Sequence, residues 1–160
     1  MSTATTDLSD AHPDVQVAEP IFNDFGGELA FFGPIKTIKV FEDNALVRAT
    51  LETPGKGRVL VVDGGGSTRC ALVGGMLGEL AVKNDWSGIL VYGYVRDSEE
   101  LSQHLVGIKA LGVHPRKSEK GLHSAVADKV LNFAGVTFKP GAWLYADADG
   151  ILVSEKPIHS

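Results

Sequence analysis

Two uninterrupted apolar runs dominate the middle of the chain. The first, RVLVVD, covers residues 58–63, and the second, GILVYGYVRD, covers residues 88–97. Strands that are buried on both faces have this composition, whereas a strand with one solvated face alternates apolar and polar residues. A glycine turn and a helical pattern separate the two runs. The feature therefore predicts a central βαβ unit, whose two strands are parallel and buried.

The segments around this unit carry shorter strand patterns. Residues 35–41, IKTIKVF, alternate apolar and polar residues and predict a strand, and the apolar runs there are broken at Gly33-Pro34. Residues 105–118 predict short strands around a glycine turn, and residues 129–155 predict a series of short strands. Turns are expected in this last segment at Ala134-Gly135, Pro140-Gly141 and Asp149-Gly150. The pattern favours one α/β domain with two sheets and helices over a plain doubly wound sheet.

Four helices are predicted between and before these strands. The N-terminal segment, residues 1–16, is small and polar, and Leu8 is expected in a short helix capped by Thr5 or Thr6. The other expected helices cover residues 45–52, 71–83 and 99–104, with caps at Asp43 or Asn44 for the first and at Ser98 for the last.

Composition limits the partners and the compartment. The net charge is -5, and no basic cluster exceeds two adjacent residues, which argues against direct nucleic-acid binding. No apolar run reaches the length of about 18 residues that a membrane helix needs, and the N-terminus lacks the features of a signal peptide. The single cysteine, Cys70, favours a reduced, cytoplasmic setting. We interpret Cys70 as a small buried residue rather than a nucleophile.

The glycines after the first buried strand raise the question of a nucleotide site. Gly64, Gly65 and Gly66 follow a predicted strand and precede a predicted helix, as a phosphate loop would. However, GGGSTR matches neither G-x-G-x-x-G nor the Gly-Lys-Ser/Thr of a P-loop. The acidic residue that would bind a ribose is also missing from the end of the next strand. We therefore expect the three glycines to form a sharp turn at the rim of a site, as scaffold rather than phosphate cradle.

The second buried strand ends in the charged pair Arg96-Asp97. Since ligands of α/β sheets bind beyond the carboxyl ends of the strands, this pair, the three glycines and the Gly74-Gly75 region are expected at one rim. A guanidinium can grip a carboxylate through two hydrogen bonds, and an aspartate is a hard ligand for Mg²⁺ or Mn²⁺. Together these groups predict a site for a small 2-keto-acid. The spacing alone leaves open a surface salt bridge, or an Arg96 that fixes a loop.

Longer segments carry a resemblance that runs from about Val17 to Glu155. They are FGG (25–27), FGPIKTIKVFEDN (32–44), GRVLVVDGGGSTRCALVGG (57–75), WSGILVYGYVRD (86–97), GIKALGVHPRKS (107–118) and GVTFKPGAWLYADADGILVSE (135–155). On these residues the chain closely resembles the RraA-like family, which includes 4-hydroxy-4-methyl-2-oxoglutarate (HMG) aldolases and the regulator of ribonuclease E activity. The resemblance implies one RraA-like domain over residues 1–160, with a swivelling-type β/β/α fold.

Aldolases of that family share a pattern of Gly, twenty residues, Arg-Asp, two residues, and Glu or Asp. Here Gly75, Arg96, Asp97 and Glu100 satisfy it. The resemblance implies that Arg96 binds the substrate and stabilises an enolate, and that Asp97 is the direct ligand of Mg²⁺ or Mn²⁺. It also implies that a backbone loop holds the pyruvate carboxylate, and the residues of that loop are Gly74, Gly75, Met76 and Leu77.

One departure from the family concerns position 75. Some members carry an acidic residue there, which could position a water on the metal, whereas this chain has Gly75. Asp63, Glu79 or a carboxylate of a neighbouring subunit are the candidates to replace it. The proton-transfer base is also left open, because His114 and His123 are expected to be surface or hydrogen-bonded residues.

The activity that the resemblance implies is a metal-dependent (class II) retro-aldol cleavage of HMG into two pyruvates. The metal and Arg96 would stabilise the enolate that forms when the C3–C4 bond breaks. Oxaloacetate decarboxylation passes through the same pyruvate enolate and is expected as well. No lysine is required, and Lys83 and Lys109 are expected on the solvated surface. Asp147 and Asp149 are expected in a β-turn rather than in a calcium loop.

Two other functions stay open. The first is a protein-binding regulator that inhibits ribonuclease E, and Asp97 favours the enzyme because regulators can lack this residue. The second is a methyltransferase of menaquinone synthesis, for which GGGSTR offers no methyl-donor site. The family also assembles as homotrimers or higher rings with sites near subunit boundaries, which is the assembly implied for this chain.

Overall fold

The two apolar runs form neighbouring parallel strands at the centre of the fold. β4 covers Val59–Asp63 and β6 covers Gly88–Val95, and all five residues of β4 are buried. The strands pair in register, with Val61 opposite Leu90. The computed structural model describes residues 2–121 and 124–159. The predicted βαβ centre is confirmed.

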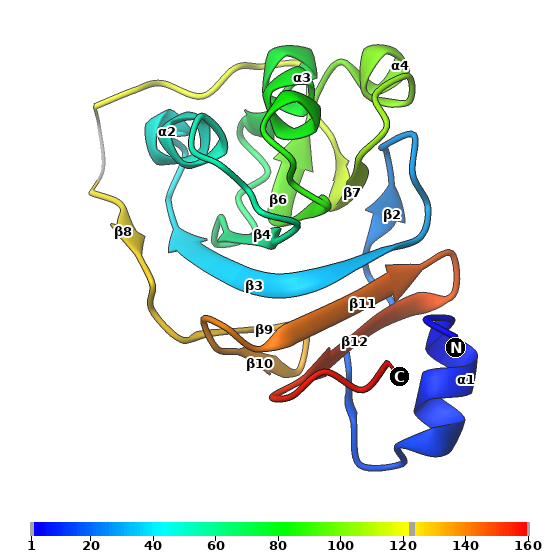
Figure 1. The fold of residues 1–160 in the computed structure, drawn as a ribbon. Coiled ribbons are helices and arrows are strands. Elements are labelled where there is room, and N and C mark those ends of the chain that lie inside the picture. Colours follow the sequence, from blue (N-terminus) through cyan, green and yellow to red (C-terminus); the bar gives the residue numbers. More distant parts are fainter. Residues whose placement is uncertain (1, 122–123, 160) are drawn as a thin grey trace.

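The layers on either side explain why these strands are apolar throughout. Alternate residues of β4 enter two different cores: Leu60 and Val62 pack under the helices, whereas Val59 and Val61 pack against a second layer of strands. Figure 1 shows the helix layer on one side of the central strands and the second strand layer on the other. The helices are α2 (Ala45–Leu51), α3 (Gly75–Lys83) and α4 (Ser98–Leu101). The opposite strands are β9 (Leu131–Phe133), β10 (Val136–Phe138), β11 (Trp143–Asp147) and β12 (Gly150–Ser154).

The strand order explains why the three helices share one face. The parallel strands run in the order β3 (Phe31–Lys39), β4, β6 and β7 (Gly107–Val113). Since the order never reverses and crossovers are right-handed, each connecting helix falls on the same side of the sheet. A doubly wound sheet, which carries helices on both faces, is therefore excluded, as predicted.

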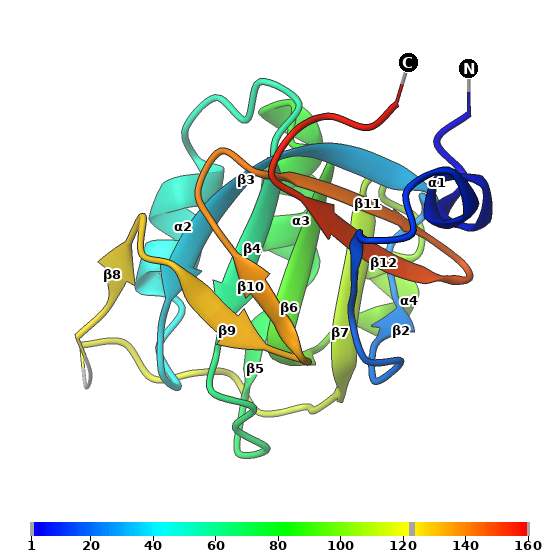
Figure 2. The ribbon, with the colours of Figure 1, turned by 90° about the horizontal axis from the view of Figure 1, so that it is seen from below.

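The strand β3 joins the parallel and antiparallel layers. Its residues 35–39 pair with β4, and its residues 31–34 pair with β11, so one strand serves both layers. Ten strands consequently form one strongly curled mixed sheet, and only the β9–β10 hairpin is separate among the described residues. Figure 2 shows this hairpin lying across the curl. The remaining strands are β1 (Gln16–Val17), β2 (Asn23–Asp24), β5 (Ala71–Val73) and β8 (Val126–Ala127).

The predicted α/β class is correct, but the expected break at Gly33-Pro34 is wrong. Pro34 lies opposite Trp143 in the last pair with β11, where β3 changes its partner, and a strand tolerates proline at such a place. The swivelling arrangement stays a prediction. In the part of the chain that the structure describes, no helix is long and apolar enough to cross a membrane.

Two element boundaries differ from the prediction. Residues 71–73 form β5 rather than the start of a helix, because they pair with the end of β6 and are fully buried there. Residues 107–113 form one strand rather than two around a glycine turn. Gly112 stays in the strand opposite Tyr94, and a Cβ at Gly112 would lie 2.9 Å from Cε2 of that ring.

The expected N-terminal helix is present, but its cap is not. α1 (Thr5–Ala11) begins after Ala4, and the Thr5 N–H and hydroxyl both donate to the Asp147 carboxylate, at 2.8 and 2.7 Å. Burial alone would raise the pKa of Asp147, but the hydrogen bonds from Thr5 and Asp149 together lower it. Asp147 and Asp149 lie at the β11–β12 turn, as predicted.

Of the caps predicted for the other helices, one is present and one is not. The Ala45 N–H at the start of α2 donates to Oδ1 of Asp43, at 2.9 Å, so one of the two expected caps is confirmed. α4 begins at Ser98 with Asp97 as its N-cap residue and ends at Leu101, earlier than expected.

Lys109 is buried, and its expected place on the surface is wrong. Its side chain is only 4% exposed, and Nζ lies 3.0 Å from Oδ1 of Asp24, at ion-pair distance but without hydrogen-bond geometry. The two residues are cross-strand neighbours in the β2–β7 pair. The opposite charge of Asp24 offsets part of the cost of burying this ammonium group. Lys83 is exposed, as expected.

Candidate functional site

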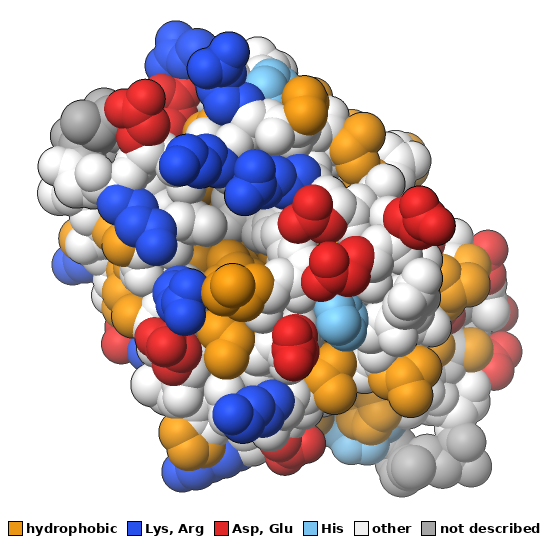
Figure 3. Space-filling model, turned by 90° about the horizontal axis from the view of Figure 1, so that it is seen from above, with side chains coloured by type: hydrophobic (Ala, Val, Ile, Leu, Met, Phe, Trp, Pro, Cys, Tyr) orange, Lys and Arg blue, Asp and Glu red, His pale blue; other side chains and the backbone are white. Residues whose placement is uncertain are grey.

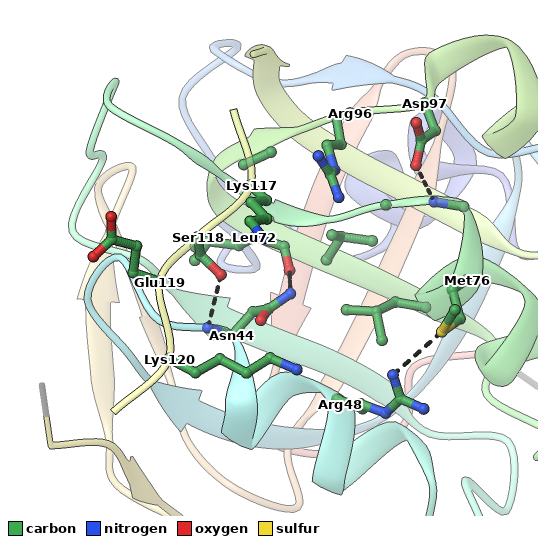
Figure 4. Close-up of a pocket in the computed structure, with 15 residues that line it drawn as sticks. Asn44, Arg48, Leu72, Met76, Arg96, Asp97, Lys117, Ser118, Glu119 and Lys120 are labelled. Atoms are coloured by element: carbon green, nitrogen blue, oxygen red, sulfur yellow. Dashed lines mark hydrogen bonds between the residues drawn. The ribbon is translucent and has the colours of Figure 1, made fainter. Parts of the chain in front are cut away.

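A cleft of about 580 Å³ opens where β5 and β6 end. Figure 4 shows Arg96 and Asp97 on one side of it and residues from α2 and the 117–120 segment on the other. The floor is formed by β5. The residues that line the cleft are Asn44, Arg48, Ala71, Leu72, Val73, Gly74, Gly75, Met76, Leu77, Arg96, Asp97, Lys117, Ser118, Glu119 and Lys120. The six site residues that the resemblance implies are therefore brought together, whereas Glu100, the last residue of the family pattern, does not line the cleft.

Two hydrogen bonds hold the glycine loop against the Arg-Asp pair. The Arg96 N–H donates to the Val73 carbonyl at 2.9 Å, and the Gly75 N–H donates to Oδ2 of Asp97 at 2.9 Å. Asp97 adopts the left-handed conformation, with φ 58°, which asparagine and aspartate tolerate better than most residues. This conformation turns the chain from β6 into α4 while the carboxylate reaches back to the start of α3. The αL backbone thus fixes where the carboxylate stands.

Carboxylates take the space that side chains at positions 74 and 75 would need. A Cβ on Gly74 would lie 2.8 Å from Oδ2 of Asp97, and a Cβ on Gly75 would collide with the Glu100 carboxylate. Glu100, which completed the family pattern, therefore brings its acid group next to position 75. Neither Asp63 nor Glu79, two of the candidates to replace an acid there, lines the cleft.

The N-terminal turn of α3 forms the adjacent wall. The N–H groups of Leu77 and Gly78 both donate to the Gly74 carbonyl at 3.1 Å, so the helix starts sharply at Gly75. The N-terminus of a helix carries a partial positive charge and offers N–H groups to an anion. Met76 is 59% exposed and stands over this turn. The wall suits a carboxylate.

The facing wall is a segment that three hydrogen bonds fix in place. The Ala71 N–H donates to the Arg116 carbonyl at 2.8 Å, the Asn44 N–H to Ser118 Oγ at 3.2 Å, and the Gly121 N–H to Oδ2 of Asp43 at 2.5 Å. These contacts carry Lys117 and Lys120 to the rim of the cleft. Sequence reasoning missed this wall, because its residues approach the site only through tertiary hydrogen bonds.

The lining is more basic than the rest of the chain. Four lining residues are cationic (Arg48, Arg96, Lys117 and Lys120) and two are acidic (Asp97 and Glu119), although the whole chain has a net charge of -5. Figure 3 shows Lys and Arg side chains along one rim of a hollow in the helix-bearing face, with acidic side chains across from them. Such a cleft concentrates small anions.

The three glycines after β4 do not line this cleft, so their expected place at its rim is wrong. The N–H groups of Gly64 and Gly66 both donate to the Tyr92 carbonyl, at 3.0 and 3.1 Å. Gly65 and Gly66 have φ of 69° and 70°, a region that favours glycine. A Cβ on Gly64 would lie 2.9 Å from the Tyr92 carbonyl oxygen. The glycines fold the chain back on β6, which confirms the scaffold role.

Other polar candidates lie away from the cleft. His114 does not line it, and its Nδ1 accepts a hydrogen bond from the Arg116 N–H at 3.1 Å. His123 lies outside the described residues. Cys70 is buried, with 6% exposure, and this burial raises the pKa of its thiol, which disfavours the reactive thiolate. The interpretation of Cys70 as a buried apolar residue is confirmed.

The donor set of the cleft fits a hard, partly hydrated cation. Within residues 2–121 and 124–159, no three His, Cys, Asp or Glu side chains are grouped as a metal cage. The Gly75 N–H donates to one of the two carboxylate oxygens of Asp97, Oδ2. Mg²⁺ typically uses one or two carboxylates and completes its shell with water and substrate oxygens. Asp97 can therefore hold such an ion together with a keto-acid.

The sequence matches known proteins over nearly its whole length. Residues 5–153 match the model of the family RraA-like, described as Aldolase/RraA. A Burkholderia mallei (strain SAVP1) protein named "Putative 4-hydroxy-4-methyl-2-oxoglutarate aldolase" is 57% identical over 161 residues, which cover 97% of each chain. A Burkholderia pseudomallei (strain K96243) protein of the same name is also 57% identical, with the same coverage.

Two solved structures share both the fold and much of the sequence. The RNA-processing inhibitor RraA from Thermus thermophilis superposes with a TM-score of 0.93 at 46% identity, covering 98% of this chain and 95% of that one. A Geobacillus kaustophilus protein described as S-adenosylmethionine: 2-dimethylmenaquinone methyltransferase superposes with a TM-score of 0.91 at 46% identity. The match covers 98% of this chain and 96% of that one. The curled mixed sheet is thus the fold of the Thermus protein.

Proposed function

The chain belongs to the RraA-like family, and from this premise we propose that it is a divalent-metal-dependent aldolase that cleaves HMG into two pyruvates. One observation carries the proposal: the start of α3, Arg96 and Asp97 converge on one cationic cleft. The name of the Burkholderia relatives, at 57% identity, supports the same activity. The substrate is a small anion, which suits the charge of the lining.

The chain's own groups can bind the pyruvyl half of the substrate. The C1 carboxylate lies at the N-terminal turn of α3, where the helix dipole favours a negative charge. Arg96 stands beside it, and within the described residues its guanidinium makes only a long contact of 3.5 Å, from Nη1 to the Pro115 carbonyl. Its other donors are therefore available for the 2-oxo group. Gly74 and Gly75 let the carboxylates of Asp97 and Glu100 lie close to this turn.

Asp97 would hold Mg²⁺ or Mn²⁺ in this cleft. The bound cation would supply Lewis acidity toward the 2-oxo group and so lower the energy of a developing enolate. Two observations support this role: the Gly75 N–H donates to the Asp97 carboxylate, and the αL conformation of Asp97 directs that carboxylate back to the start of α3. Glu100, whose carboxylate lies next to Gly75, is a further acid group that could hold a water.

The cleavage follows from the chemistry of the substrate. Loss of the C4 hydroxyl proton lets the electron pair form a C4 carbonyl as the C3–C4 bond breaks. One pyruvate leaves, and the other half remains as a pyruvate enolate whose oxyanion Arg96 stabilises. Protonation at C3 yields the second pyruvate. Loss of CO₂ from oxaloacetate gives the same enolate, so we extend the proposal to oxaloacetate decarboxylation.

Pyruvate release tests the proposal. HMG and oxaloacetate are each supplied with Mg²⁺, and pyruvate is coupled to NADH oxidation by lactate dehydrogenase; the reaction is then repeated with excess EDTA. We expect EDTA-sensitive release, and we expect Asp97→Ala to lower the rate by at least about 10³-fold, because it removes the cation's only proposed protein ligand. Circular dichroism checks that the variant is folded. A fully active Asp97→Ala protein would refute the metal role.

A second candidate is a protein-binding regulator that inhibits ribonuclease E. It is favoured by the 46% identity to a Thermus protein described as an RNA-processing inhibitor. The absence of pyruvate release with any divalent metal would favour this function, and a pull-down with ribonuclease E would then test it. We do not extend methyltransferase activity to this chain, because the Gly64–Gly66 segment packs on β6.

The proposed assembly and compartment follow from the family. We propose a homotrimer or a higher ring in the cytoplasm, with sites near the subunit boundaries. Light scattering coupled to size-exclusion chromatography measures the stoichiometry directly. A monomer in solution would contradict the proposed assembly.

A further inference from the structure

Arg48 is a cation at the cleft that has no strong partner among the residues that the structure describes. Its Nη1 lies 3.2 Å from the Met76 sulfur, and a thioether is only a weak acceptor. Its Nε lies 3.7 Å from a carboxylate oxygen of Glu52, one turn further along α2, and both side chains are about half exposed, 42% and 51%. Such a surface pair contributes little. Most of the five donors of this guanidinium are therefore available to a ligand.

Two lysines also line the cleft. In the described part of the chain, no carboxylate lies within 4 Å of the ammonium group of Lys117 or Lys120. Figure 4 shows Lys120 directed toward Arg48, while the carboxylate of Glu119 points away from the cleft. The same view shows Arg96 and Asp97 at the opposite side. The cleft thus has two cationic ends, and the pyruvyl half of a substrate occupies only one of them.

We propose that Arg48, with Lys120 beside it, binds a second carboxylate of the substrate, so that the cleft selects 2-keto-acids with a carboxylate at each end. The inference rests on the proposed function, since it takes the C1 carboxylate to lie at the start of α3. A bidentate contact from a guanidinium rewards a planar carboxylate and gives nothing to a methyl group. Arg48 is then a specificity-determining residue that does not touch the reacting carbons.

Binding of two unreactive keto-acids tests the inference without turnover. 2-Oxoglutarate carries the second carboxylate, 2-oxopentanoate carries a methyl group in its place, and neither has the C4 hydroxyl that cleavage needs. With Mg²⁺ present, calorimetry is expected to give a Kd at least about 10-fold lower for 2-oxoglutarate. Arg48→Met should remove this difference by weakening 2-oxoglutarate alone, and Arg48→Lys should restore part of it.

The matched control is Arg116→Met. Arg116 is exposed and adjacent to Lys117 in sequence, but it does not line the cleft. The substitution Arg116→Met removes the same charge from the same region as Arg48→Met, so a general electrostatic effect would appear in both variants. We expect Arg116→Met to keep the wild-type preference for 2-oxoglutarate.

Turnover with a matched substrate pair then separates this inference from the proposed function. HMG and 4-hydroxy-2-oxopentanoate differ only in the C5 carboxylate, which a hydrogen replaces in the second compound. In Arg48→Met the KM for HMG should rise about 10- to 100-fold, with little change for 4-hydroxy-2-oxopentanoate.

Each outcome decides between the two claims. Equal binding of both keto-acids by the wild type, or an unchanged preference in Arg48→Met, would overturn the inference even if HMG is cleaved. A preference that Arg48→Met abolishes, without pyruvate release from HMG, would support the carboxylate site and overturn the aldolase proposal. Binding of neither keto-acid would overturn the inference, and pyruvate release from HMG would still decide the proposed function.

Discussion

The chain has two glycine segments that look alike in sequence and differ in what surrounds them. Gly64–Gly66 follows β4, and Gly74-Gly75 follows β5, so each stands where a strand ends. A Cβ at Gly64 would meet the backbone of β6 and the side chain of Leu72. A Cβ at Gly74 or Gly75 would instead meet the carboxylates of Asp97 and Glu100. The first segment is glycine because the fold is tight there, and the second because polar groups occupy the space.

The difference shows how a structural glycine can be told from a functional one. Both segments make close contacts, so proximity alone does not separate them. The group that each glycine contacts does separate them. A buried backbone carbonyl indicates packing, whereas half-exposed carboxylates beside a cleft indicate a site. Substitutions in the two regions should therefore affect different measurements, stability in one and turnover in the other.

The largest expected effect is on the cleft side of the comparison. Arg96→Ala should weaken substrate binding and lower kcat by about 10²- to 10³-fold, because a group that stabilises the enolate oxygen is lost. The free energy of unfolding of this variant should change by less than about 0.5 kcal/mol, since among the described residues the Arg96 side chain makes only a long hydrogen bond to the Pro115 carbonyl. Steady-state kinetics and urea denaturation measure the two quantities. Wild-type kcat in this variant would contradict the assigned role.

The next effect falls on the packing side. Gly64→Ala should lower the free energy of unfolding by about 1–3 kcal/mol, because the new methyl group overlaps Leu72 and the Tyr92 carbonyl. The activity of the molecules that remain folded should stay near that of the wild type. Urea denaturation followed by circular dichroism gives the first value. A variant as stable as the wild type would show that β6 can yield at this position.

The smallest expected effect in this comparison comes from the matched change Gly75→Ala. The new methyl group meets the carboxylate of Glu100, whose side chain is 55% exposed and can swing away, and alanine is favoured in a helix. Stability should stay within about 0.5 kcal/mol of the wild type. The value of kcat/KM should nevertheless fall about 10-fold, because the Glu100 carboxylate beside the loop is displaced. Lost stability with intact turnover would reverse the comparison.

Much of the central fold could be predicted because its signals are local. Uninterrupted apolar runs identified β4 and β6, and the turn residues of the C-terminal strands identified their ends. The predictions failed where a partner strand overrode local preference. Residues 71–73 look helical in isolation but pair with β6, and Gly112 looks like a turn but makes room for Tyr94.

Some residues of the candidate site could be predicted from the sequence, and others could not. Gly75, Arg96 and Asp97 are recognisable from the family pattern, and the sequence alone places them at the ends of successive elements. Arg48, Lys117 and Lys120 carry no such signal, because exposed cations on a short helix and on a loop look like any solvated surface. Hydrogen bonds donated by Asn44 and Ala71, and one that Asp43 accepts, bring the loop to the cleft.

The sequence by itself determined the buried parallel strands, the helix that follows the glycines and the Arg-Asp pair at a strand end. These follow from hydrophobic periodicity and backbone preference, which act over a few residues. Only the tertiary structure decided that β3 joins both layers, that Lys109 is buried against Asp24, and that a second cationic end faces Arg96 across the cleft. Each of these depends on contacts between residues far apart in the chain, whose free energy exists only once the layers have packed.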